Sequence, residues 1–84
     1  MKVDDILQLI ASTLNVAPAR VSLESKAGDF EEWDSIGALS LMATLDRHGI
    51  HFDGDNVERL QSVRGIVDAF QDASQLDGSL STDN

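Results

Sequence analysis

The chain of 84 residues carries 15 acidic and 6 basic side chains, a formal net charge of −9, and it contains no cysteine. This length gives one small domain without room for separate catalytic and regulatory parts. The charge argues against nucleic-acid binding, which needs clustered Lys and Arg, and favours protein partners with basic surfaces. Without cysteine the chain has no disulfide, no thiolate nucleophile and no thiolate-bound zinc.

The beginning of the chain, Met1-Lys2-Val3-Asp4-Asp5, lacks the long apolar run of a signal peptide. No later stretch approaches the apolar length that spans a bilayer. We therefore expect a cytoplasmic protein with no membrane insertion, present as a monomer.

Residues 3–15 carry an apolar stripe at helical spacing, formed by Val3, Ile6, Leu7, Ile10 and Leu14. Asp4 and Asp5 precede most of the stripe, in a first turn where the helix dipole favours anions. The pattern predicts a helix that ends before Pro18, because proline has no N–H to donate and restricts the residue before it.

From residue 15 to residue 34 neither a helical nor an alternating period persists. A loop of this length is unusual in a compact domain and is commonly functional or held by its own side chains. We expect four apolar residues to anchor it on the core, namely Val21, Leu23, Phe30 and Trp33. Residues 22–25 are predicted to form a short turn.

The tetrapeptide Trp33-Asp34-Ser35-Ile36 ends the loop and begins a second helix, over about residues 35–48. The stripe expected to face the core is Ile36, Leu39, Met42, Ala43 and Leu45, and Gly49 ends the pattern. An anionic group on Ser35 would find backbone N–H donors and partial positive charge at this helix start. Asp and Ser are also common N-caps, so either residue can be explained as a cap alone.

Two further helices are predicted. The turn-forming residues 53–56 precede a short helix over about residues 55–60, with Val57 and Leu60 facing inward. Ser62 then caps a helix over about residues 62–74, with the stripe Val63, Ile66, Val67 and Phe70. The fold is predicted to be all-α, a four-helix bundle with a long first loop and a short third helix in residues 1–75, followed by a disordered tail over residues 76–84.

Catalytic and metal-binding interpretations find little support. His48 and His51 are three residues apart but lack an indicated third ligand. A calcium loop beginning at Asp53 would place Arg64 where a bidentate glutamate is needed. Ser35 and His48 would lie about 20 Å apart along a regular helix, too far for a hydrolase pair. A catalytic histidine or a metal protein is therefore the weakest hypothesis.

This arrangement of helices, the strong negative charge and the Asp-Ser-aliphatic sequence at residues 34–36 together resemble the acyl carrier protein family over residues 3–73. The resemblance implies that Ser35 accepts 4′-phosphopantetheine from coenzyme A, transferred by a separate phosphopantetheinyl transferase. It also implies that Asp34 helps to orient the transferase and the loop, and that Ile36 and Trp33 pack beside the attachment point.

In this family the arm carries an acyl or aminoacyl group as a thioester, and the acyl chain can enter the space between the second and third helices. Here that space would be bordered by Leu39, Met42, Val57 and Leu60. The expected docking residues for basic partner surfaces are Glu31, Glu32, Asp55 and Glu58. These partners would be the transferase and the enzymes that load and transfer the acyl or aminoacyl group.

The chain differs from fatty-acid carriers in its second helix. The face expected to be exposed carries Gly37, Ala38, Ser40 and Thr44 where those carriers are rich in glutamate. It is more similar to carriers of specialised lipid, polyketide, peptide or polysaccharide-modification pathways. The leading hypothesis is thus a carrier protein rather than an enzyme, without a metal. The alternative is an unmodified, small acidic helical protein-interaction module in which Ser35 is only a cap.

Overall fold

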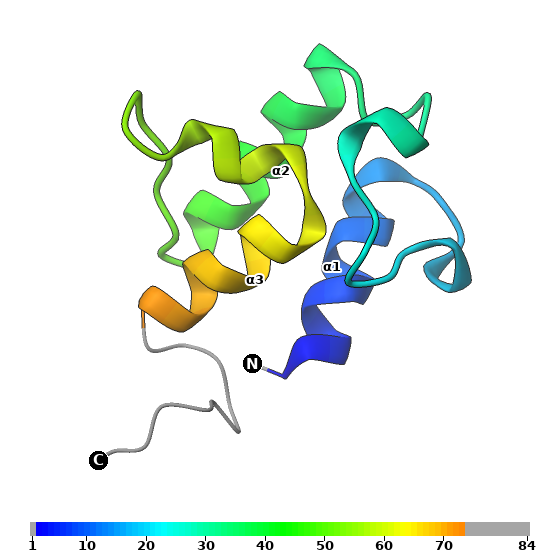
Figure 1. The fold of residues 1–84 in the computed structure, drawn as a ribbon, viewed down its shortest axis with the longest axis horizontal. Coiled ribbons are helices and arrows are strands. Elements are labelled where there is room, and N and C mark those ends of the chain that lie inside the picture. The colour runs from blue at the N-terminus through cyan, green and yellow to red at the C-terminus, as the bar shows by residue number, and fades with distance from the viewer. Residues whose placement is uncertain (1, 74–84) are drawn as a thin grey trace.

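The computed structural model describes residues 2–73, and these residues form a purely helical domain without a β-strand (Figure 1). The α-helices are α1 (Val3–Leu14), α2 (Ser35–Arg47) and α3 (Val63–Asp72). Three 3₁₀ helices join them, η1 (Pro18–Arg20), η2 (Ala27–Asp29) and η3 (Val57–Gln61). Within this part of the chain, no helix has the length and apolar character needed to cross a membrane.

The all-α prediction is confirmed, with one difference in the third helix. The segment expected to form a short helix over residues 55–60 is the 3₁₀ helix η3, five residues long. Residues 2–73 therefore contain three α-helices where four helices were predicted. The predicted tail over residues 76–84 lies outside the described residues.

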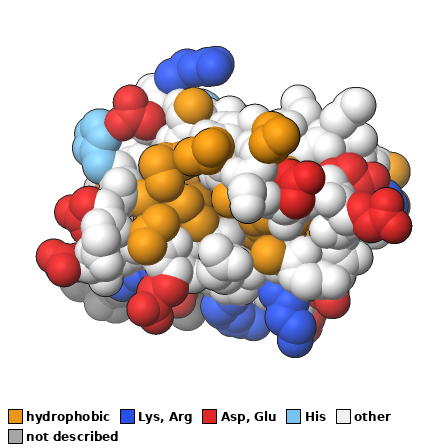
Figure 2. Space-filling model, turned by 90° about the horizontal axis from the view of Figure 1, so that it is seen from above, with side chains coloured by type: hydrophobic (Ala, Val, Ile, Leu, Met, Phe, Trp, Pro, Cys, Tyr) orange, Lys and Arg blue, Asp and Glu red, His pale blue; other side chains and the backbone are white. Residues whose placement is uncertain are grey.

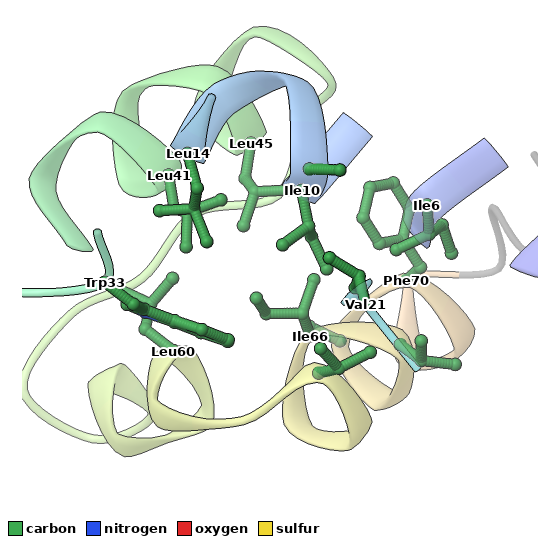
Figure 3. Close-up of a cluster of buried hydrophobic side chains, with 14 of the residues drawn as sticks. Ile6, Ile10, Leu14, Val21, Trp33, Leu41, Leu45, Leu60, Ile66 and Phe70 are labelled. Carbon is green, nitrogen blue, oxygen red and sulfur yellow. The ribbon is translucent and has the colours of Figure 1, made fainter. Parts of the chain in front are cut away.

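The predicted stripes of α1 and α3 contribute a large part of the core (Figure 3). Ile6 and Ile10 of α1 are fully buried, as are Val63, Ile66 and Phe70 of α3. The predicted cap of the last helix is also confirmed, because the Gly65 N–H donates to the Ser62 hydroxyl at 3.0 Å. At the end of α1, Asn15 adopts a left-handed conformation with φ 62°, which ends the helix three residues before Pro18.

The predicted core face of α2 is wrong. The buried residues of this helix are Gly37, Leu41 and Leu45, whereas Ile36 is 73% and Leu39 63% exposed. Only Leu45 of the expected stripe is fully buried. The expected exposed face is wrong in the same way, because it included Gly37, which lies against α1 and the preceding loop.

The long loop packs on the core through all four predicted anchors. Val21, Phe30 and Trp33 are buried, and the half-buried Leu23 packs against the core. The predicted turn at residues 22–25 is confirmed by the Ser25 N–H, which donates to the Ser22 carbonyl at 3.1 Å.

A second set of contacts joins the loop to the beginning of α3. Lys26 forms an isolated antiparallel bridge with Ser62, and the Val63 N–H donates to the Ser25 carbonyl at 3.0 Å. The Arg20 guanidinium lies 5.0 Å from the centre of the Phe30 ring, within reach of a cation–π interaction. The loop is therefore held against α3 before the residues that lead into α2.

The first prediction concerns the close approach at Gly37. A Cβ at this position would lie 2.2 Å from the Glu32 carbonyl oxygen and 3.1 Å from Leu14 Cδ2. Alanine gains about 1 kcal/mol over glycine in helix propensity, but overpacking against backbone costs about 1–3 kcal/mol. We expect Gly37→Ala to lower the melting temperature, by about 4–8 °C for each kcal/mol of net destabilisation.

The matched control is Gly28→Ala, because a Cβ at Gly28 meets no atom within 4 Å. Thermal unfolding followed by circular dichroism compares the two variants with the wild type. Equal melting temperatures for Gly37→Ala and Gly28→Ala would show that the loop does not constrain α2 at this point.

Candidate functional site

Ser35 lies at the first position of α2 with its side chain exposed. The preceding residue, Asp34, has extended backbone (φ −94°) and is the N-cap of the helix. Its Oδ1 accepts a hydrogen bond from the Gly37 N–H at 2.9 Å. Of the two residues that the sequence offered as caps, Asp34 therefore has this role, and the Ser35 hydroxyl is not needed for it.

The backbone around Ser35 is suited to an anionic group. The first N–H groups of a helix lack intrahelical acceptors, and Asp34 satisfies only that of Gly37. The N–H groups of Ser35 and Ile36 lie in the same turn, where the helix dipole also favours negative charge. A phosphodiester on the Ser35 hydroxyl would lie next to this turn.

Trp33 and Ile36, the residues that flank Asp34 and Ser35, point in opposite directions. Trp33 is only 4% exposed and packs in the core, with its ring centre 6.2 Å from that of Phe30. Ile36 is 73% exposed and contributes apolar surface instead of core. Of the two flanking residues, Trp33 alone packs into the domain beside Ser35.

A groove of about 510 Å³ begins beside Ser35 and extends between α2 and η3. Its walls include the four residues that the sequence placed at the second and third helices, Leu39, Met42, Val57 and Leu60. The other lining residues are Trp33, Asp34, Ser35, Ala38 and Gln61. This volume lies within the range of small-molecule sites.

The face that contains the start of α2 combines apolar and acidic side chains. Figure 2 shows apolar side chains gathered near the centre of this face, with acidic side chains around them and a few Lys, Arg and His side chains at its edges. The four expected docking residues, Glu31, Glu32, Asp55 and Glu58, are all exposed. Glu32 also lies 3.5 Å from the Arg20 guanidinium, so part of its charge is compensated within the chain.

The two histidines lie away from Ser35, at the other end of α2. His48 is the C-cap residue of this helix, and the His51 imidazole pairs with the Asp46 carboxylate. Within residues 2–73, no three side chains of His, Cys, Asp or Glu converge in a way that could hold a metal ion.

One buried polar group, on a residue that lines the groove, could not be identified from the sequence. The Trp33 indole Nε1 is buried and has no hydrogen-bond partner, and it is the one such side-chain atom found among the non-exposed residues of the described range. Sequence reasoning placed Trp33 beside Ser35 but could not show that its N–H is unpaired, because pairing depends on atoms from distant segments.

Comparison with protein-family models matches residues 4–70 to the phosphopantetheine attachment site family. Because the match covers most of the chain, the protein belongs to this family, whose domains carry covalent 4′-phosphopantetheine and are in general carriers rather than catalysts. Searches of curated proteins and of solved structures gave no significant match. The resemblance noted in the sequence is thus confirmed at the level of the family.

The second prediction concerns the cap of α2. Asp34→Ala removes the acceptor for the Gly37 N–H and should cost about 1 kcal/mol of folding free energy. Asp34→Asn keeps a capping oxygen and should stay within a few tenths of a kcal/mol of the wild type. Thermal unfolding of the three proteins measures the difference, and equal losses in both variants would mean that the carboxylate charge matters more than the cap.

Proposed function

We propose that Ser35 is the attachment point of 4′-phosphopantetheine and that the chain carries acyl or aminoacyl groups as thioesters. The observation that carries this proposal is the family match over residues 4–70, together with the exposed Ser35 hydroxyl at the start of α2. The Asp34 cap supports it, since it leaves that hydroxyl free.

The attachment is a phosphoryl transfer performed by a separate phosphopantetheinyl transferase. The Ser35 oxygen forms a bond to the β-phosphorus of coenzyme A, adenosine 3′,5′-bisphosphate leaves, and the hydroxyl proton passes to a base of the transferase. The arm supplies a terminal thiol, which this cysteine-free chain otherwise lacks. The residues of the chain present the arm and do not carry out the chemistry of the cargo.

We assign the groove beside Ser35 to the cargo. Its apolar side chains from α2 and η3 can shield an acyl group, because burial of apolar surface from water is favourable. The half-buried Met42 is unbranched and can adapt to different shapes. The arm itself carries a phosphate and amides, whose desolvation is costly, and is expected to stay at the rim.

The partner-docking surface is proposed to combine an apolar centre with an acidic rim. Ile36 and Leu39 provide exposed apolar side chains next to Ser35. Glu31, Asp55 and Glu58 add exposed carboxylates. A partner with a basic rim around an apolar patch matches this surface, and the rim charges would mainly accelerate and orient association.

We place the carrier in a specialised lipid, polyketide, peptide or polysaccharide-modification pathway of the cytoplasm, as a monomer. The assignment to a specialised pathway is supported by the composition of α2. The sole acidic residue of this helix is Asp46, which lies in its last turns. A helix whose exposed residues include the neutral Ser40 favours partners other than those that recognise a glutamate-rich helix.

The third prediction tests Ser35 itself. After incubation with coenzyme A, magnesium and a broad-specificity phosphopantetheinyl transferase, the intact mass should increase by one phosphopantetheine in the wild type and remain unchanged in Ser35→Ala. Ser40→Ala, which alters an exposed serine on the same helix, should be modified like the wild type. Modification of Ser35→Ala would defeat the assignment of the attachment point to Ser35. No modification of the wild type with several transferases would support the unmodified interaction module.

The fourth prediction tests the acidic rim. We expect Glu31→Gln and Glu58→Gln each to raise the KM for the transferase by about two- to fivefold at low salt, as measured for exposed charge pairs. The difference in KM between these variants and the wild type should decrease at higher salt, because salt screens the charges of the acidic rim. Asp4→Asn is the matched control, because Asp4 lies in the first turn of α1. The start of α1 and the start of α2 lie at opposite ends of the domain (Figure 1). Equal KM values for all four proteins would remove these residues from the docking surface.

A further inference from the structure

The strongest unexplained feature of the molecule is the Trp33 indole N–H. The Trp33 side chain is 4% exposed, and its Nε1 atom is buried without an acceptor. A buried donor loses its hydrogen bonds to water and gains nothing in return, so folded proteins rarely leave such a group unpaired. An unpaired donor beside a groove is therefore informative about what the groove binds.

Trp33 forms part of the floor of the groove beside Ser35. Trp33 and Leu60, at 4% and 1% exposure, are among its most deeply buried lining residues, whereas Ser35, Leu39 and Gln61 are exposed and belong to the rim. In Figure 3 the Trp33 indole extends from the loop into the core close to Leu60. A group that reaches this floor meets apolar side chains and the side chain of Trp33 together.

We infer that the Trp33 indole N–H donates a hydrogen bond to a carbonyl oxygen of the carried acyl chain beyond the thioester carbonyl, so that the groove favours 3-oxoacyl groups over saturated acyl chains. This inference rests on the proposed carrier function of Ser35. The hydrocarbon part of a saturated chain on the floor would bury the N–H permanently without an acceptor, whereas the 3-oxo oxygen supplies one.

The arm is a poorer candidate for the acceptor than the cargo. Each amide of the arm brings an N–H donor as well as a carbonyl, and the polar residues at the groove, Asp34, Ser35 and Gln61, lie at its rim. An amide on the floor would leave its own donor unpaired. A 3-oxoacyl group brings only acceptors.

The oxygen needs a path to Nε1, which has no solvent contact in this conformation. The half-buried Met42 of the lining is unbranched, and a change in its conformation is the path that the inference uses.

The experiment uses two cargoes of equal chain length that differ at the third carbon. The transferase loads the ¹⁵N-labelled protein from butyryl-coenzyme A or from acetoacetyl-coenzyme A, and intact mass confirms each product. Because the chain has one tryptophan, a single indole ¹H–¹⁵N resonance reports on Nε1. We expect it to move downfield and to exchange more slowly with solvent in the acetoacetyl form than in the butyryl form. The same position and exchange rate in both forms would overturn the inference.

Melting temperature provides a second readout. One net hydrogen bond to the cargo should raise the melting temperature of the acetoacetyl form above that of the butyryl form by about 4–8 °C. Trp33→Phe keeps an aromatic ring without the N–H and should abolish this difference. Ser40→Ala, which removes an exposed polar side chain of α2 outside the groove, should preserve it. Persistence of the difference in Trp33→Phe would assign the oxygen to another donor and overturn the inference.

Failure of the proposed function gives a different result. If Ser35 accepts no phosphopantetheine, neither cargo is loaded and the mass does not change, so both proposals fall. If both cargoes load on Ser35 and the indole resonance does not distinguish them, the carrier function stands and the inference about Trp33 fails.

Discussion

The close contact between α2 and the end of the long loop determines the geometry of the site. The backbone carbonyl of Glu32 approaches Gly37 so closely that no Cβ fits between them, and Asp34 caps the same turn. This contact fixes the direction in which each residue of the turn points. Trp33 is directed into the core, while Ser35 is exposed to solvent. The Ser35 hydroxyl is therefore only two residues along the chain from Trp33, which forms part of the floor of the groove.

The spacing of apolar residues predicted the buried face correctly for the helices with one apolar face, α1 and α3. It predicted the wrong buried face for α2, which has apolar residues on two faces. In α1 and α3 a single stripe separates core from solvent, and periodicity was sufficient. In α2 apolar residues lie on both sides, so spacing alone could not decide between Leu39 and Leu41. The deciding residue is Gly37, which is buried because it is small enough for close backbone contact, a property that a search for large apolar side chains does not detect.

The candidate site was predictable where it depended on local sequence. The sequence placed Ser35 at the start of a helix, and the family resemblance placed Leu39 and Val57 at the groove, where the structure also has them. The bridge between Lys26 and Ser62 and the unpaired indole of Trp33 were not predictable, because they depend on how segments distant in sequence meet. The 3₁₀ form of η3 was missed for a related reason, since a five-residue segment carries too little periodicity to distinguish helix types.

The exposed side chains of Ile36 and Leu39 have a consequence for the protein when no partner is bound. Two such chains could bury these side chains against each other, since exposed apolar patches promote association. The formal net charge of −9 opposes this, because every approach of a second copy brings like charges together. Repulsion between two copies thus works against burial of the apolar surface of one copy on the other. The same negative charge attracts a positively charged partner, so the apolar surface remains available to that partner.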